Sequence, residues 1–158
     1  MNLLLLLINC EDTSVKDSLK KITNIGSLVL LFGAPLASAQ TLRVQTQVAQ
    51  LGGELRYGLF NSERSFEDQM PYVGVAMPVV EAVQTAVFVD VPPGVYGLAV
   101  FHDRNGNQVL DRNLFGIPTE PYGFSRNPNI GFKAPGFDAF AFTVGQADLT
   151  LTINLNGQ

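Results

Sequence analysis

The sequence is poor in the residue types that most often carry catalysis and cross-linking. It contains one cysteine, Cys10, one histidine, His102, and no tryptophan. One thiol cannot form a disulfide within the chain, and one histidine without further cysteines argues against a zinc site. Nucleophilic catalysis needs a base beside the nucleophile, so the lone His102 is expected to be structural rather than catalytic. The absence of tryptophan also disfavours a sugar-stacking platform.

Positive charge is scarce as well. The chain has 10 Lys and Arg residues against 14 Asp and Glu residues, which gives a net charge of −4 at pH 7. An acidic surface without a basic cluster argues against nucleic acid and anionic membranes as partners. The apolar run Ile25 to Leu36 is shorter than the roughly 20 residues that span a bilayer.

That apolar run instead has the features of a secretory signal peptide. Lys20 and Lys21 precede it, and Ala37-Ser38-Ala39 is a small-x-small cleavage site. We therefore expect residues 1–39 to be removed on export, without later membrane insertion, and residues 40–158 to fold as one domain in the periplasm or outside the cell. The remaining 119-residue length is sufficient for a single core.

The residues before Leu19 do not fit a signal peptide, because Glu11 to Ser18 is acidic and polar. This suggests that translation starts near Leu19. The alternative is a lipoprotein signal ending at Cys10, but it lacks a preceding basic segment and the small residues before the cysteine.

Alternating apolar and polar residues predict about seven strands, because side chains alternate between the two faces of a strand. The expected strands are residues 42–48, 55–59, 73–80, 83–89, 95–101, 140–144 and 149–155. This pattern predicts an all-β fold, a single antiparallel β-sandwich of immunoglobulin-like or transthyretin-like type.

Local signals add detail to that sandwich. Gly52-Gly53 predicts a turn joining the first two strands as a hairpin. Pro78 favours an edge position for its strand, and the apolar strand 95–101 favours a central position. Ser65 could cap a helical turn running to Gln69.

A polar stretch follows the expected central strand and resembles a calcium-binding loop. Asp103, Asn105, Asn107 and Asp111 occupy relative positions 1, 3, 5 and 9, with the Val109 carbonyl expected at position 7. Alternate oxygens in a tight loop can converge on one calcium ion, here with modest affinity.

The pattern is incomplete, because Leu114 replaces the usual glutamate at position 12 and Gln108 the usual glycine at position 6. Glu120 could fold back as a further ligand. The alternative is a hairpin turn at Asn105-Gly106, with Asx side chains holding their own backbone.

Residues 114–136 form a long segment without periodicity, and such segments are often functional or pack on themselves. Its aromatic residues could pack on the end of the sandwich, together with Phe137. They could also line a ligand site with polar contacts from Glu120, Tyr122, Ser125, Arg126 and Asn127. The aromatic residues in question are Phe115, Tyr122, Phe124, Phe132 and Phe137.

The stretch from Pro92 to Asn127 resembles the bacterial family named domain of unknown function 2141. Members of that family share a Pro-Pro-Gly-x-Tyr segment, then H-D-x-N-x-N-x-x-L-D-x-N, then G-I-P-x-E-x-Y-G-F-S-N. Here Arg126 separates Ser125 from Asn127, and Gln108 replaces a common glycine. The resemblance implies an exported single-domain β-sandwich and implies no activity. The Pro-Pro-Gly-x-Tyr segment is also similar to that of adhesive and accessory β-sandwich modules.

Three functions fit these observations. The first is an exported, non-catalytic binding or accessory module with a structural calcium loop, expected to be monomeric and to bind a small molecule, a glycan or an envelope protein. The second is a hydrolase that uses Asp103, Asp111 and Glu120 for acid–base chemistry. The third is a structural envelope protein without a ligand. The missing nucleophile–base pair favours a module over an enzyme.

Overall fold

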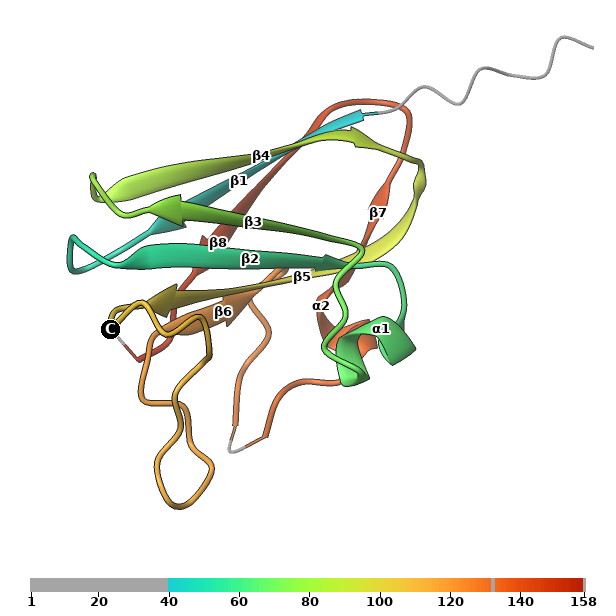
Figure 1. Ribbon diagram of the computed structural model, residues 1–158. Coiled ribbons are helices and arrows are strands. Elements are labelled where there is room, and N and C mark those ends of the chain that lie inside the picture. The colour runs from blue at the N-terminus through green and yellow to red at the C-terminus, as the bar shows by residue number, and fades with distance from the viewer. Residues whose placement is uncertain (1–39, 132, 158) are drawn as a thin grey trace, which may run out of the picture. The chain divides into compact units, whose positions relative to one another are not determined.

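Eight strands and two short helices make up the described part of the chain (Figure 1). The computed structural model describes residues 40–131 and 133–157, so the expected signal peptide, residues 1–39, lies outside it. The strands are β1 (Gln40–Gln47), β2 (Glu54–Phe60), β3 (Val73–Pro78), β4 (Val83–Val91), β5 (Gly94–Asp103), β6 (Tyr122–Phe124), β7 (Ala141–Val144) and β8 (Leu149–Asn154), and the helices are α1 (Glu63–Glu67) and α2 (Phe137–Phe140). Neither helix in this part of the chain has the length and apolar character needed to cross a bilayer.

The strands form two sheets packed face to face. One sheet has the order β4-β1-β8, and the other has the order β3-β2-β5-β6, with β7 also paired to β5. The alternation seen in the sequence decides which face of each strand is buried: Leu42, Val44 and Thr46 of β1 point inward, while Arg43 and Gln45 are exposed. The all-β prediction is thus confirmed.

The core between the sheets is apolar and contains one buried hydrogen bond. Tyr57 of β2 donates its hydroxyl to Thr46 Oγ1 of β1 at 3.0 Å, which links the two sheets. The buried apolar residues of this core are Leu42, Val44, Val48, Leu55, Tyr57, Leu59, Val79, Ala86, Phe88, Val91, Tyr96, Leu98, Val100, Val144 and Ile153.

The predicted first hairpin is wrong. β1 pairs antiparallel with β4 and parallel with β8, whereas β2 pairs with β3 and β5. Gly52 and Gly53, both at positive φ, carry the chain from one sheet to the other, and their backbones bond Val79 in the β3–β4 connection. Periodicity shows which face of a strand is buried but not which strand it pairs with. The parallel β1–β8 pair also makes the sandwich mixed rather than purely antiparallel.

The expected central and edge strands are found at those positions in the sheet. β5 pairs with β2, β6 and β7, and β3 pairs only with β2 and ends at Pro78. The structure adds a strand, β6, inside the segment expected to lack one, because three residues are too few to show a period. The helical turn is α1, and its N-cap is Ser62 rather than Ser65; the two serines hold each other's backbone amides in a capping box.

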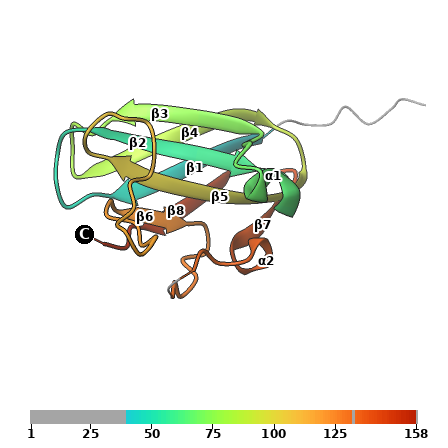
Figure 2. The same cartoon turned by 60° about the horizontal axis from the view of Figure 1, so that its bottom comes forward.

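The five-stranded sheet is covered on its outer face too. A cluster of Phe60, Phe124, Phe137 and Phe140 fills this side. The two helices, α1 and α2, lie beside each other near one end of this sheet (Figure 2). Gly97 of β5 is required here, because a Cβ at that position would lie 2.4 Å from the Phe140 ring. The polar residues of the domain are instead concentrated at the end of β5 and in the segment that follows it.

Candidate functional site

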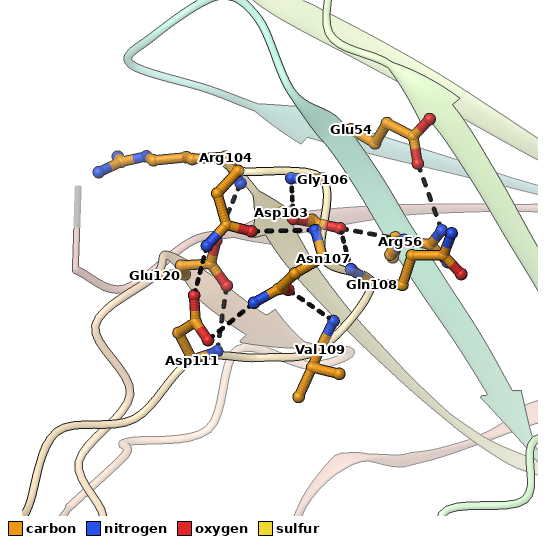
Figure 3. A network of polar contacts seen from close by, with 11 residues as sticks. Glu54, Arg56, Asp103, Arg104, Gly106, Asn107, Gln108, Val109, Asp111 and Glu120 are labelled. Carbon is orange, nitrogen blue, oxygen red and sulfur yellow. Dashed lines mark hydrogen bonds and ion pairs between the residues drawn. The ribbon is translucent and has the colours of Figure 1, made fainter.

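Asp103 ends β5 and has no exposed surface. Its Oδ1 accepts a hydrogen bond from the Gly106 amide and its Oδ2 one from the Gln108 amide, both at 2.7 Å (Figure 3). On the neighbouring strand β2, Arg56 Nε lies 3.3 Å from Asp103 Oδ2. The carboxylate therefore closes the turn after β5 and ties it to β2.

The environment of Asp103 keeps it charged. Burial alone would raise its pKa, but the amides of Gln108 and Gly106, the Arg56 charge and the Asn107 amide together lower the pKa below its usual value. Arg56 Nε is buried and makes no hydrogen bond, so its contact with Asp103 is an ion pair only. Arg56 Nη2 also lies 3.4 Å from Glu54 Oε2, so the guanidinium bridges a buried and a half-exposed carboxylate, and loss of Asp103 would leave it with the weaker, more solvated partner.

Asn105 and Asn107 hold the middle of the turn. Asn105 Oδ1 accepts from the Asn107 amide at 3.0 Å, and Asn107 Oδ1 accepts from the Val109 amide at 2.9 Å. Their side-chain N–H groups point the other way, to the Asp111 carboxylate: Asn105 Nδ2 lies 2.6 Å from Oδ2 and Asn107 Nδ2 2.9 Å from Oδ1. This is the Asx-turn arrangement that was the alternative to a metal loop.

Glu120 does fold back onto the turn, as the sequence suggested it could. Its Oε1 accepts from the Arg104 amide at 2.9 Å and its Oε2 from the Asp111 amide at 3.1 Å. The side chain is buried. Glu120 thus clamps the two ends of the turn together through their backbones.

The oxygen donors of this turn have the chemistry that calcium prefers. Asn105, Asn107 and Asp111 already lie together, whereas Asp103 faces amides and Arg56. All six oxygens of Asp103, Asp111 and Glu120 accept hydrogen bonds from N–H groups of the protein. Among residues 40–131 and 133–157, no group of three or more His, Cys, Asp or Glu side chains could hold a metal ion. An ion would have to displace the asparagine N–H groups from Asp111, so calcium stays a prediction.

His102 is buried near the end of β5, directly before Asp103. Its Nε2 lies 2.7 Å from the Gly52 carbonyl oxygen, and its backbone amide donates to the Pro121 carbonyl at 2.8 Å. The ring therefore joins the β1–β2 connection to the end of β5. This is the environment expected of a structural histidine.

Residues 111–119 form a hairpin, most of which lies in the segment 114–136 that was expected to be an irregular loop. The Thr119 amide donates to the Asp111 carbonyl at 2.8 Å, and the Asn113 amide donates to the Ile117 carbonyl at 2.9 Å. Asn113 also organises the tip, because its Oδ1 accepts from the amides of Phe115 and Ile117 at 2.9 and 3.1 Å. We refer to this segment as the 111–119 hairpin.

The tip of the 111–119 hairpin is apolar and exposed. Leu114 and Phe115 retain 101% and 88% of their accessible surface, and Ile117 retains 41%. Figure 1 shows the hairpin in gold and orange, projecting away from both sheets. Asn113 and Gly116, whose φ is +77°, are the residues in the sequence that indicate a turn here. The exposure of the tip could not be predicted, because its residues show no alternation of apolar and polar side chains.

The other residues expected to contact a ligand lie in different parts of the structure. Tyr122 lines a hollow of about 420 Å³ together with Ile117, Pro118, Ile130 and Gly131. Ser125 is buried, where it accepts from the Leu98 amide and donates to the Phe140 carbonyl. The Asn127 side chain bonds the backbone of β8, and Arg126 Nη1 donates to the Ala141 carbonyl. Of these residues, only Tyr122 lines the hollow.

The aromatic residues of the long segment are divided as well. Phe124 and Phe137 pack in the outer cluster, as the packing alternative predicted. Phe115 does not, because it lies at the exposed hairpin tip, and Phe132 lies outside the described residues.

Comparison with known proteins agrees with the motif read from the sequence. The family described as "Uncharacterized protein conserved in bacteria (DUF2141)" matches residues 44–152. No curated protein and no solved structure matches the chain. The family match spans β1 to β8 and includes the whole polar turn and the 111–119 hairpin. The chain therefore belongs to the DUF2141 family.

Proposed function

We propose that this protein is an exported, non-catalytic binding module that docks on a protein of the cell envelope through the 111–119 hairpin. The observation that carries the proposal is the pair of exposed apolar side chains, Leu114 and Phe115, at the end of an ordered hairpin. Exposed apolar groups cost free energy in water, and a clustered pair is typical of an interaction site. The signal peptide expected from the sequence supports export.

The arrangement of the carboxylates supports a non-catalytic role. Acid–base catalysis needs carboxyl groups that can reach a substrate. Asp103 is fully buried and Glu120 nearly so, and both oxygens of each accept hydrogen bonds from the protein's own amides. Asp103 and Glu120 therefore hold the turn in place. Because Asp111 belongs both to the turn and to the base of the 111–119 hairpin, the turn also fixes where the hairpin begins. No observation favours the hydrolase alternative.

The hairpin is preorganised for binding. Asn113 holds two tip amides with its side chain, and Arg112 Nη1 donates to the Gly116 carbonyl at 3.0 Å. A tip that is already ordered loses little conformational entropy on binding. Calcium, which we retain as part of the proposal, would add stiffness at the hairpin base through oxygen atoms of Asn105, Asn107 and Asp111.

The size of the tip favours a protein partner over a lipid surface. Full burial of Leu114 and Phe115 would contribute about 1.5–3 kcal/mol each. A total of this size is comparable to marginal, reversible membrane attachment by one acyl chain. In a protein interface, the same two side chains can act as central anchors within a larger contact.

Site-specific photo-crosslinking in the producing cell tests this proposal. A photoreactive residue replaces Leu114 in one variant and Thr150, exposed on β8, in a matched control. We expect a covalent adduct with an envelope protein at position 114 and none at position 150, and loss of the adduct when Phe115→Ser is added. Absence of an adduct at 114, or equal adducts at both positions, would contradict the proposal. Unfolding of the Phe115→Ser variant should match wild type, because the side chain is exposed.

A further inference from the structure

The free edges of the two sheets are protected to different degrees. β8 runs along one edge, and Asn127 covers it: Nδ2 donates to the Thr152 carbonyl at 3.0 Å, and Oδ1 accepts from the Asn154 amide at 2.8 Å. One amide side chain thus replaces part of a neighbouring strand. β3 has only six residues and ends at Pro78, which has no N–H to offer. Both are known ways to prevent unwanted strand pairing.

β4 has no such protection. It is nine residues long, and within the described part of the chain it pairs with β1 alone. Within residues 40–131 and 133–157, no backbone or side-chain group outside β1 bonds to its ladder positions. Before Asp90, its exposed side chains are all valine or threonine: Val83, Val87 and Val89 are 53%, 45% and 66% exposed, and Thr85 is exposed between them. Residues 83–89 of β4 carry no charge, and a long uncharged stretch of edge strand is a template for pairing with another chain.

We propose that two copies of this protein pair antiparallel through β4, about a two-fold axis, and join their three-stranded sheets into one sheet of six strands. A second copy suits this edge because the segment is compatible with itself. Residues 82–88 carry no charge, so antiparallel pairing centred near Ala86 places no like charges opposite each other. A two-fold contact of one surface with itself closes the assembly and leaves β4 paired on both sides.

The flat part of β4 sets the limit of the interface. The register with β1 shifts between Gln40 and Leu42, and Asp90 has a φ of +57°. This bulge turns the end of the strand out of the flat ladder, which confines pairing to residues before Asp90. Glu81 and Asp90 flank the paired segment and bring acidic groups of the two copies near each other, so added salt should strengthen the dimer.

Sedimentation equilibrium of the purified protein over a wide range of concentrations tests the proposal. We expect a reversible monomer–dimer equilibrium that tightens with salt. Val87→Lys should weaken dimerisation by about tenfold or more, because both copies then carry the change at the interface. Gln45→Lys on the solvent face of the central strand β1 adds the same charge away from the edge and should leave the dimer unchanged.

Hydrogen exchange provides a second measurement that does not depend on any variant. The β4 amides that point away from β1 should become more protected as the protein concentration rises. A monomer at all concentrations, which is the state expected from the sequence, would overturn the proposal. Equal effects of the two lysine substitutions would overturn it too, as would protection of β4 only when a peptide from another protein is added. The hairpin crosslinks do not depend on β4, so the two proposals can fail independently.

Discussion

At the scale of single residues, Asp103 is the side chain on which the polar end of the domain most depends. It accepts two short backbone hydrogen bonds and lies beside the Arg56 charge, with no exposure to solvent. Among the described residues, Asp103 is the buried carboxylate that both accepts the amides of the turn and forms an ion pair with the neighbouring strand β2. Substitutions here therefore test how the turn is held.

Asp103→Asn should destabilise the domain by about 2–4 kcal/mol, because its NH2 group would face one of the two amide donors and Arg56 would keep only the half-exposed Glu54 as a counter-charge. Urea unfolding measures the loss. Asp138→Asn, at an exposed position in α2, is the matched control and should change stability by less than about 0.5 kcal/mol. Equal stability of the two variants would show that Asp103 does not hold the turn.

The lowered pKa of Asp103 predicts a pH dependence with a definite sign. Because the folded pKa lies below the ordinary value of 3.8, the folded state favours the charged form. The stabilisation is fully present above that ordinary value and is lost as the pH falls through the folded pKa. The difference in unfolding free energy between wild type and Asp103→Asn should therefore be constant near neutral pH and shrink below about pH 4. A difference that stays constant down to pH 2 would contradict this assignment.

At the scale of elements, the 111–119 hairpin depends on Asn113 rather than on packing. Its tip residues are exposed, so core contacts cannot define its shape, and the Asn113 side chain bonds two tip amides instead. The hairpin is thus an ordered element with little connection to global stability. Its order can be changed without unfolding the sandwich.

Asn113→Ala should loosen the tip and leave the sandwich intact. Loss of two hydrogen bonds of about 1 kcal/mol each should speed hydrogen exchange at Phe115 and Ile117 by about tenfold or more. Global unfolding should lose no more than the roughly 2 kcal/mol of these two bonds, because no core contact is removed. Asn129→Ala, at another exposed asparagine, should change neither quantity. Unaltered exchange in Asn113→Ala would mean that backbone bonds alone order the tip.

At the scale of the whole molecule, the sequence predicted the buried face of each strand better than it predicted which strands pair with each other. Alternation located β1, β2, β4, β5 and β8, because burial of every second side chain is a local property. The pairing of β1 with β4 and β8 joins residues far apart in the chain, and no local signal encodes it. This is why the expected hairpin at Gly52-Gly53 was wrong.

The same distinction holds for the polar end of the domain. Spacing placed Asp103 to Asp111 in one tight turn, and Glu120 does return to it. Spacing could not show that Arg56, from another strand, would lie beside Asp103, nor that Asn105 and Asn107 would donate to Asp111. An oxygen-rich turn can hold its own amides or a cation, and the sequence pattern is the same for both.

Thermal melts with calcium and with chelator distinguish these two roles for the whole domain. A bound ion raises stability by mass action, by about 2.7 kcal/mol at a hundredfold excess over its dissociation constant. If calcium binds with the modest affinity of extracellular modules, millimolar calcium should raise the melting temperature and chelator should reverse the rise. Asp111→Asn should abolish the calcium response, whereas Asp138→Asn should retain it. An unchanged melting temperature at millimolar calcium would reject the ion, and the hydrogen bonds of Asp103, Asp111 and Glu120 would then be the full account of how the turn is held.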